Sequence, residues 1–254
     1  MTVTVNIDLV TRIEGHLAIE VEVDKGKVVD AHSKATLFRG IEKILVGRDP
    51  RDAPTIASAI CGVCHATHHI ASTLAVESAM NCTPPSNAIV IRNIIQGTSF
   101  LQSHLAHIFL LTGPDYDIYG LGNDQWLSIL KNVALPSQRL CNQIIAIFGG
   151  KSPHFWSSTP GGEAVPPTPE RIASARGKLA SIKALVDEQA PTVRNYLDSH
   201  TELQDYGVGP KNFLSYGVFP NPENPSDRLF KRGIVTEGKS SPLDLERIGE
   251  SVKH

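Results

Sequence analysis

Residues 61–69 place two cysteines and three histidines within nine positions, and these side chains are common metal ligands. The segment reads Cys61-Gly62-Val63-Cys64-His65-Ala66-Thr67-His68-His69. Two cysteines separated by two residues can direct both sulfur atoms at one metal ion, because a tight turn at the start of a helix brings their side chains together. Gly62 allows that turn. The partial positive charge at the helix start is expected to favour thiolate over thiol.

The spacing of the cysteine pair is compatible with three kinds of site. It fits half of a zinc site, a dithiol redox pair, or half of a site for a softer metal. A structural zinc ion needs two more ligands, but Cys82 and Cys141 are isolated in the sequence, and Cys82 is expected to be a small buried residue. A thioredoxin-like site needs a preceding buried strand, and residues 52–60 lack that pattern. The spacing alone leaves these alternatives open.

The composition excludes several functional classes. The chain has 254 residues and a formal net charge of −2 with interspersed signs, so it offers no basic face for nucleic acid. No apolar run reaches membrane-spanning length, and the amino terminus lacks a basic region followed by an apolar segment. Four cysteines do not indicate a disulfide framework. We therefore expect a soluble, cytoplasmic protein, although export together with a partner that carries a signal would also be compatible.

The periodicity predicts an α+β fold that is mainly α. Residues 1–36 alternate apolar and polar side chains and predict an antiparallel β-meander with a turn at Lys25-Gly26. Residues 37–206 predict a bundle of long helices that carries the cysteine pair, with a break at residues 112–117, a division at Pro136 and a loop at residues 151–162. Residues 207–254 are irregular, with a possible hairpin near residues 213–235.

Four segments occur in a fixed order and together resemble one family. They are Arg12-Ile13-Glu14-Gly15-His16, Leu37-Phe38-Arg39-Gly40-Ile41-Glu42, Gly47-Arg48-Asp49-Pro50-Arg51-Asp52 and the cysteine pair. This series resembles the amino-terminal half of the large, nickel-carrying subunit of the [NiFe] hydrogenases, most clearly over residues 7–120. The resemblance implies reversible heterolytic cleavage of H2 at a nickel–iron centre with diatomic ligands on iron. It also implies an iron–sulfur small subunit that takes up the electrons.

The resemblance assigns the metal ligands residue by residue. Cys61 matches a terminal nickel ligand, and Cys64 matches a ligand that bridges nickel and iron. His68 matches a histidine that hydrogen-bonds a bridging cysteine sulfur, although at this position a packed histidine would be the ordinary interpretation. The family binds nickel with four thiolates from two such pairs, and this sequence contains one pair. The chain is therefore expected to need a complementary carboxy-terminal chain, and to have no hydrogen activity alone.

Three carboxylates also match family positions. Glu14 matches a glutamate that passes protons beside the cysteines, and Glu42 matches one that binds Mg²⁺. Asp115, with Asp117 as the fallback, matches an aspartate of a polar canopy above the metals, which includes an arginine from the carboxy-terminal half. Without the resemblance, Glu14 would be a solvated turn residue, Glu42 an ordinary helix residue that pairs with Lys43, and the aspartates capping residues.

Other positions depart from the family or admit a simpler interpretation. Ala59 occupies the position where the family usually has an arginine, which alters the surroundings of the thiols. His104 and His107 are expected to be core or interface histidines, and His154 either lines an electron path or is an exposed loop residue. Arg39 is expected to pair with acidic groups.

Two other functions remain alternatives at this stage. The first is a non-catalytic or zinc-binding assembly subunit of a redox complex. The second is a dithiol oxidoreductase, in which Cys61 and Cys64 would form a reversible disulfide.

Overall fold

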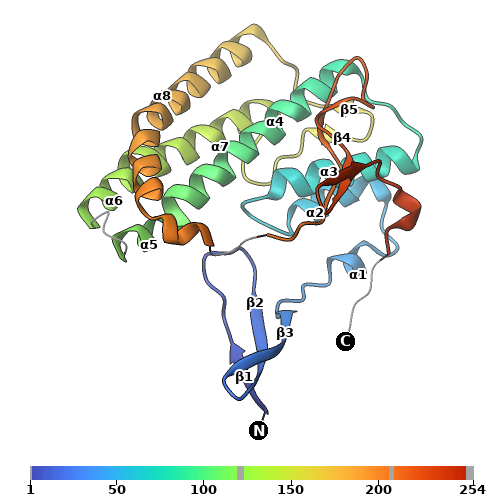
Figure 1. The fold of residues 1–254 in the computed structure, drawn as a ribbon. Coiled ribbons are helices and arrows are strands. Elements are labelled where there is room, and N and C mark those ends of the chain that lie inside the picture. The colour runs from blue at the N-terminus through green and yellow to red at the C-terminus, as the bar shows by residue number, and fades with distance from the viewer. Residues whose placement is uncertain (1, 119–122, 206–208, 250–254) are drawn as a thin grey trace.

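The fold consists of a small sheet that projects from a larger helical body (Figure 1). We analysed a computed structural model, which describes residues 2–118, 123–205 and 209–249. The predicted α+β, mainly α class is confirmed, including a three-stranded antiparallel meander at the amino terminus. None of the helices in the described ranges is both long enough and apolar enough to span a membrane.

The projecting sheet has the strand order β1-β2-β3, with β1 at Thr2–Ile7, β2 at Leu17–Asp24 and β3 at Lys27–Ala35. Both pairings are antiparallel, and Val21 of β2 lies opposite Val5 of β1 and Ala31 of β3. Lys25 and Gly26 form the β2–β3 turn with positive φ angles of 48° and 75°, and glycine accepts such angles without steric cost. A bulge shifts the β2–β3 register between Glu22 and Val23.

The helical body contains eight α-helices in the described residues. Their bounds are α1 Ile41–Leu45, α2 Ala53–Ser58, α3 His65–Ala79, α4 Ser86–Leu105, α5 Gly113–Ile118, α6 Asn123–Ile129, α7 Leu135–Gly149 and α8 Pro169–Ser199. Short 3₁₀ segments lie at Pro50–Asp52, Thr201–Asp205 and Leu245–Arg247. Two π-helical segments, Ala106–Leu111 and Leu130–Ala134, extend α4 and join α6 to α7.

These π segments change two expected helix boundaries. Residues 124–149 were expected to divide at Pro136, but α6 continues through a π segment directly into α7, where Pro136 occupies the first turn. The backbone N–H of Leu135, just before the proline, donates to the carbonyl of Leu130 in the π pattern, so the chain stays helical across this position. The expected break at residues 112–117 is also shorter than predicted, since α5 begins at Gly113.

The hydrophobic core lies where α3, α4, α7 and α8 pack together. The apolar stripe of α4 faces α7, and Ile95, Ile145 and Phe148 have at most 2% of their surface exposed. Thr168 caps the start of α8 by accepting a hydrogen bond from the backbone N–H of Arg171. The core therefore fixes the orientation of α3, whose first turn follows the cysteine pair.

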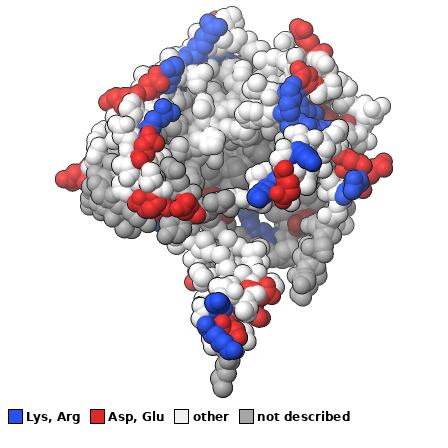
Figure 2. Space-filling model, in the orientation of Figure 1, with Lys and Arg blue, Asp and Glu red and all other residues white. Residues whose placement is uncertain are grey.

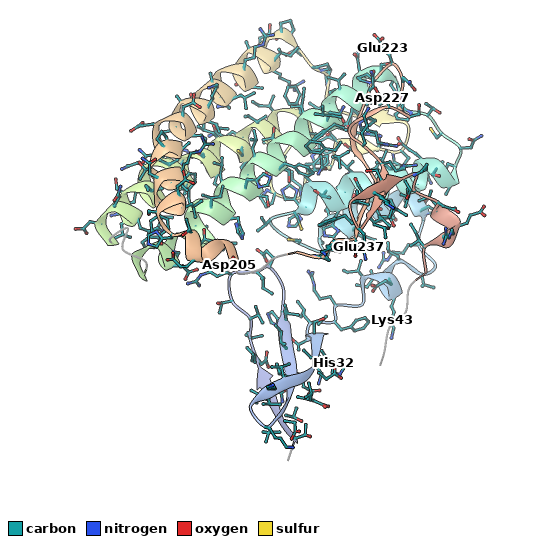
Figure 3. The ribbon with its side chains drawn as sticks, viewed as in Figure 1. His32, Lys43, Asp205, Glu223, Asp227 and Glu237 are labelled. Atoms are coloured by element: carbon teal, nitrogen blue, oxygen red, sulfur yellow. The ribbon has the colours of Figure 1, made fainter. Side chains whose placement is uncertain are left out.

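The carboxy-terminal segment adds short strands beside α4. β6 at Phe213–Ser215 pairs with β9 at Gly233–Thr236, and β9 pairs with β10 at Lys239–Ser241. Between them, β7 at Val218–Pro220 pairs with β8 at Arg228–Phe230. Figure 3 locates the turns of this segment by Glu223, Asp227 and Glu237. A further hairpin, β4 at Ser158–Thr159 and β5 at Gly162–Glu163, lies inside the range that was expected to be loop.

Candidate metal centre

The cysteine pair forms a tight turn between α2 and α3. The backbone N–H groups of Val63 and Cys64 donate to Cys61 Sγ at 3.4 and 3.3 Å. Cys64 immediately precedes α3, and both thiols are partly exposed. Arg39 holds the residue just before Cys61. Its Nη1 donates a hydrogen bond to the carbonyl oxygen of Ile60 at 2.7 Å. The expectation that Arg39 pairs with acidic groups stays a prediction.

The environment of Cys64 holds its thiol in the protonated form. Its pKa is raised to about 12, chiefly by burial, then by the hydrogen bond that the thiol donates to Cys61 and by the charges of Cys61 and Glu14. The expectation that the helix start favours thiolate is wrong for Cys64. Burial and two neighbouring acidic groups outweigh the helix dipole there.

The link between β1 and β2 brings Glu14 to the cysteine pair. Its carboxylate acts electrostatically on the Cys64 thiol, although Glu14 itself is exposed. Gly15 permits the sharp turn of this link with a φ of 85°. Two residues earlier, Arg12 Nη2 donates to Asp115 Oδ1 of α5 at 3.1 Å. The link is therefore anchored to α5 on one side of Glu14 and to β2 on the other.

The Arg12–Asp115 ion pair was not predicted. The sequence identified Asp115 but expected its arginine partner to come from the carboxy-terminal half of the family's subunit, whereas the partner in this structure belongs to the same chain. The side chains are 41% and 38% exposed, so solvent screens the pair and its contribution to stability is small. The side chain of Asp117, the fallback, lies outside the described part of the chain.

The histidines around the pair divide into two groups. His68 is half-buried on α3, and its backbone N–H donates to the carbonyl of Cys64 at 3.3 Å. His65 and His69 are each 1% exposed. Burial lowers the pKa of His65 to about 4 and also lowers the pKa of His69, so both rings are neutral at pH 7.

The buried histidines attach the segment 154–158 to α3. The Nε2–H of His69 donates to the carbonyl of Ser158 at 2.7 Å, and its ring lies 4.3 Å from the ring of Phe155, centroid to centroid. His154 is half-buried; its Nδ1–H donates to the carbonyl of Ser58 at 2.9 Å, and its ring centroid lies 5.5 Å from that of His65. His154 is therefore packed rather than an exposed loop residue.

For His104 and His107, the sequence left a core or an interface position open. Both side chains are exposed at the end of α4 and in the following π segment, so neither belongs to the core of the described chain. Glu42 is likewise exposed, in the first turn of α1. Within the described residues, no ion pair joins Glu42 to Lys43, whose ammonium group lies 5.6 Å from the centroid of the Phe38 ring.

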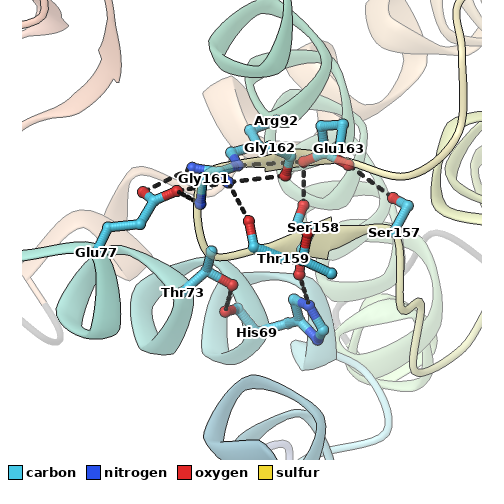
Figure 4. Close-up of polar contacts among 10 residues, drawn as sticks. All are labelled: His69, Thr73, Glu77, Arg92, Ser157, Ser158, Thr159, Gly161, Gly162 and Glu163. Carbon is cyan, nitrogen blue, oxygen red and sulfur yellow. Dashed lines mark hydrogen bonds and ion pairs between the residues drawn. The ribbon is translucent and has the colours of Figure 1, made fainter. Parts of the chain in front are cut away.

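A buried ion-pair network lies between the carboxy-terminal part of α3, helix α4 and the β4–β5 hairpin, and it was not predicted (Figure 4). Arg92 donates from Nη1 and Nη2 to the two carboxylate oxygens of Glu77, both at 2.9 Å, and from Nε to Glu163 at 3.1 Å. All three side chains are at most 4% exposed. Arg92 Nη2 also donates to the carbonyls of Thr159 and Gly162, each at 3.0 Å.

The carboxylates of the network are saturated by further donors. Glu77 accepts from the backbone N–H of Gly161 at 2.8 Å, and Glu163 accepts from the hydroxyls of Ser157 and Ser158. Burial still raises the pKa of Glu163, because desolvation exceeds the effect of Arg92 and the hydroxyl donors. The network joins α3, α4 and the β4–β5 hairpin. A sequence signal existed, since Arg92 interrupts an apolar helix face, but its partners lie 15 and 71 residues away.

The ligand set suits half of a soft-metal site. Cys61 and Cys64 supply two sulfur donors in contact with each other at a partly exposed surface. Among the described residues, no cluster of three or more histidine, cysteine or acidic side chains could hold a metal ion alone. A four-coordinate metal at this position therefore needs ligands from outside residues 2–118, 123–205 and 209–249.

Fold and site together define the class of protein. It is a largely helical chain that holds two thiols, which could bind a metal ion, at the start of α3. A family model described as "Nickel-dependent hydrogenase" matches residues 39–123 and 119–254, and one described as "HoxL-like" matches residues 4–38. The chain belongs to the nickel-dependent hydrogenase family, and the resemblance found in the sequence is confirmed.

Individual relatives agree with this assignment. The chain is 34% identical to the periplasmic [NiFeSe] hydrogenase large subunit of Desulfomicrobium baculatum, which aligns with 99% of this chain and 54% of that relative. It is 30% identical to the hydrogenase-2 large chain of Escherichia coli (strain K12), over 100% of this chain and 59% of that relative. The solved structure of the Ni-Fe-Se hydrogenase from D. vulgaris Hildenborough in the reduced state matches with a TM-score of 0.87 and 34% identity, over 100% of this chain and 56% of that chain. The chain thus spans little more than half the length of these relatives.

Proposed function

We propose that this chain forms the amino-terminal part of the catalytic subunit of a [NiFe] hydrogenase, an oxidoreductase that reversibly cleaves H2 within a complex. The observation that carries the proposal is the pair of contacting thiols of Cys61 and Cys64, held at the start of α3 in a chain of the nickel-dependent hydrogenase family. The second pair of thiolate ligands comes from a complementary carboxy-terminal segment. Electrons leave through an iron–sulfur small subunit.

The two cysteines have distinct proposed roles. Cys61 would hold nickel, and Cys64 would hold nickel together with an iron ion that carries diatomic ligands. When bound, this nickel–iron centre supplies Lewis-acid activation of H2 for heterolytic cleavage. Because Cys64 binds its proton tightly, ligation must displace that proton, and metal binding is expected to be coupled to proton release.

Side chains around the pair serve the proton and the ligand geometry. Glu14 is close enough for its charge to raise the pKa of Cys64, so it is placed to accept a proton released from that thiol. His68 lies one turn into α3, and its proposed role is to donate a hydrogen bond to a cysteine sulfur of the loaded site and so tune the basicity of that sulfur. Asp115 holds Arg12 and thereby positions the link that carries Glu14.

Two assignments remain: a Mg²⁺ ion at Glu42 and the cellular compartment of the protein. Glu42 offers an exposed carboxylate for Mg²⁺, which prefers oxygen ligands and retains several waters. The cytoplasmic location expected from the sequence stays a prediction, while the D. baculatum relative is named as a periplasmic hydrogenase.

The metal content of the native complex tests the proposal. The complex is purified without chelators through a tag on this chain, and nickel, iron and zinc are measured per chain. The proposal requires nickel and iron in the unsubstituted complex, and loss of nickel in Cys64→Ser. Cys82→Ser is the matched control, because Cys82 lies beyond the end of α3, and it should keep its nickel.

Two other results would identify the alternatives. Zinc alone would indicate a non-catalytic, zinc-binding assembly subunit. No metal, together with a reversible disulfide between Cys61 and Cys64, would indicate a dithiol oxidoreductase.

A further inference from the structure

A cavity of about 800 Å³ lies between α3, α4 and the β7–β8 hairpin. Pockets that bind small molecules have volumes of about 300–1,000 Å³ and walls that are mostly apolar. The apolar side chains that line this cavity come from all three elements, and they include Ile70, Leu74, Ile89, Phe100, Val218 and Phe219. The cavity therefore has the size and the lining of a small-molecule site.

The hairpin is attached to α4, so the cavity is a formed part of the fold. The side-chain amide of Asn93 donates a hydrogen bond to the carbonyl of Pro220 at 2.9 Å. The ring of Phe219 contacts the rings of Phe100 and Phe230 edge-on, with a centroid distance of 5.4 Å in each case. These contacts hold one wall of the cavity in place, including Phe219 itself, whose φ of 59° is uncommon for an aromatic residue.

Two arginine side chains from the carboxy-terminal segment, Arg228 and Arg232, line the same cavity. The side chain of Arg228 passes directly over Gly217. A Cβ atom at Gly217 would lie 2.5 Å from Cδ of Arg228 and 2.9 Å from the carbonyl oxygen of Phe230, so glycine is needed there. Arg232 is oriented by a hydrogen bond from its Nε to the carbonyl of Tyr216 at 3.0 Å. Both side chains therefore have defined positions at the cavity wall.

In the described part of the chain, neither of these arginines forms an ion pair with a carboxylate. The nearest acidic residue in the sequence, Asp227, is paired with Lys231 at 2.5 Å. Arg92, which also lines the cavity, is paired with Glu77 and Glu163. Figure 2 shows basic side chains grouped over the carboxy-terminal strands. The described lining of the cavity therefore carries an excess of positive charge.

The two cations also act on each other. Burial and the charge of Arg232 lower the pKa of Arg228, and a guanidinium group nevertheless stays charged at neutral pH. An oxyanion bound between the two groups would relieve their repulsion. Guanidinium groups match carboxylate and phosphate through pairs of parallel hydrogen bonds. This part of the cavity therefore suits an anionic group and repels a metal cation.

We propose that the cavity binds a small amphipathic anion, with its apolar body against α3 and α4 and its carboxylate or phosphate group on Arg228 and Arg232. The apolar lining selects the body of the ligand, and the two guanidinium groups select its charge. The site is independent of the proposed function, because none of the residues proposed to bind metal or transfer protons lines the cavity.

Isothermal titration calorimetry of the purified native complex tests the proposal. Octanoate and octyl phosphate are titrated below their micellar concentrations. Octanol, which lacks the charge, and inorganic phosphate, which lacks the apolar chain, are the matched probes. At least one of the octyl anions should bind saturably at one site per chain, and both matched probes should bind at least about tenfold more weakly. The tighter of the two anions identifies the head group as a carboxylate or a phosphate.

Removal of either guanidinium group should weaken this binding. Arg228→Gln and Arg232→Gln each remove hydrogen bonds to a charged group, so the affinity for the octyl anion should fall roughly 10- to 100-fold. Arg194→Gln, which removes an exposed arginine of α8 outside the cavity lining, is the matched control and should bind normally. Unfolding temperatures are measured for all three variants. Because Arg232 is exposed, Arg232→Gln should fold even if Arg228→Gln does not.

Three results would overturn the proposal. They are the absence of saturable binding by either octyl anion, equal affinity for octanol, and unchanged affinity in folded Arg228→Gln and Arg232→Gln complexes. The first result includes the case in which another part of the native complex fills the cavity. The nickel content of the same preparation tests the metal centre separately, so either proposal can fail without the other.

Discussion

At the residue scale, the proposed chemistry depends on the environment of Cys64. Its thiol is buried on one side, hydrogen-bonded to Cys61 and exposed to the negative charge of Glu14, and its pKa rises to about 12. Binding of a cation to the sulfur reverses this preference, because a metal ion stabilises thiolate strongly. In the proposed site, the charge of Glu14 therefore acts on the sulfur that would bind the metal.

Replacement of Glu14 by glutamine tests its proton-transfer role. Glutamine keeps the size of the side chain and removes the acidic group, so H2/D2O isotope exchange by the complete enzyme should slow by roughly 10²- to 10⁴-fold. Nickel and iron content should remain unchanged. Glu22→Gln, on the polar face of β2, serves as the control and should exchange at the normal rate. Unchanged exchange in Glu14→Gln would remove the role assigned to Glu14.

The sequence singled out candidate site residues, whose roles stay predictions, but not the contacts around them. Cys61, Cys64 and Glu14 lie in short motifs whose spacing reports local geometry, so they could be found without a structure. The ion pair between Arg12 and Asp115 spans 103 positions, and no local pattern specifies such a contact. The protonated state of Cys64 was also missed, because burial and the approach of Glu14 arise only from the folded chain.

At the element scale, α3 connects the site to the rest of the body. Its first turn follows Cys64, its buried histidines hold the segment 154–158, and Glu77 near its end enters the ion-pair network. Helix α4 and the β4–β5 hairpin complete that network through Arg92 and Glu163. Because the network joins three elements, we infer that it fixes the hairpin and, with His69, the adjoining segment against α3.

Removal of Arg92 tests the contribution of this network. Arg92→Ala would leave Glu77 and Glu163 buried without their cation, at a cost of about 3–5 kcal/mol in unfolding free energy. For a chain of this size, the unfolding temperature should fall by roughly 10 °C. Arg51→Ala, which removes an exposed ion pair with Asp49, is the control and should unfold at the normal temperature. Equal unfolding temperatures for the two variants would show that the network adds little to stability.

The boundaries of the helices were less predictable than their existence. Apolar spacing identified the long helices because a buried face repeats every three to four residues. It did not identify the π segments at residues 106–111 and 130–134, where the backbone continues through positions expected to be breaks. Pro136 lies at the start of α7, directly after the π segment, rather than at a gap.

At the scale of the whole molecule, the metal site is incomplete within the described residues. The site has two sulfur ligands, and the β1–β3 sheet has an exposed apolar side. The relatives are nearly twice as long as this chain. In the proposed function, an additional portion of the subunit supplies the remaining ligands. The sequence identified a single cysteine pair. The exposed apolar side of the sheet became apparent only when strand register placed Val5, Val21 and Ala31 together.

X-ray absorption at the nickel edge of the purified native complex tests the central claim most directly, because it reports the atoms bound to nickel. The account predicts nickel with sulfur neighbours, and fewer nickel–sulfur contacts or less bound nickel in Cys61→Ser, with Cys82→Ser unchanged. Nickel surrounded by nitrogen and oxygen alone, an unchanged sulfur signal in Cys61→Ser, or a complex that contains no nickel would contradict it.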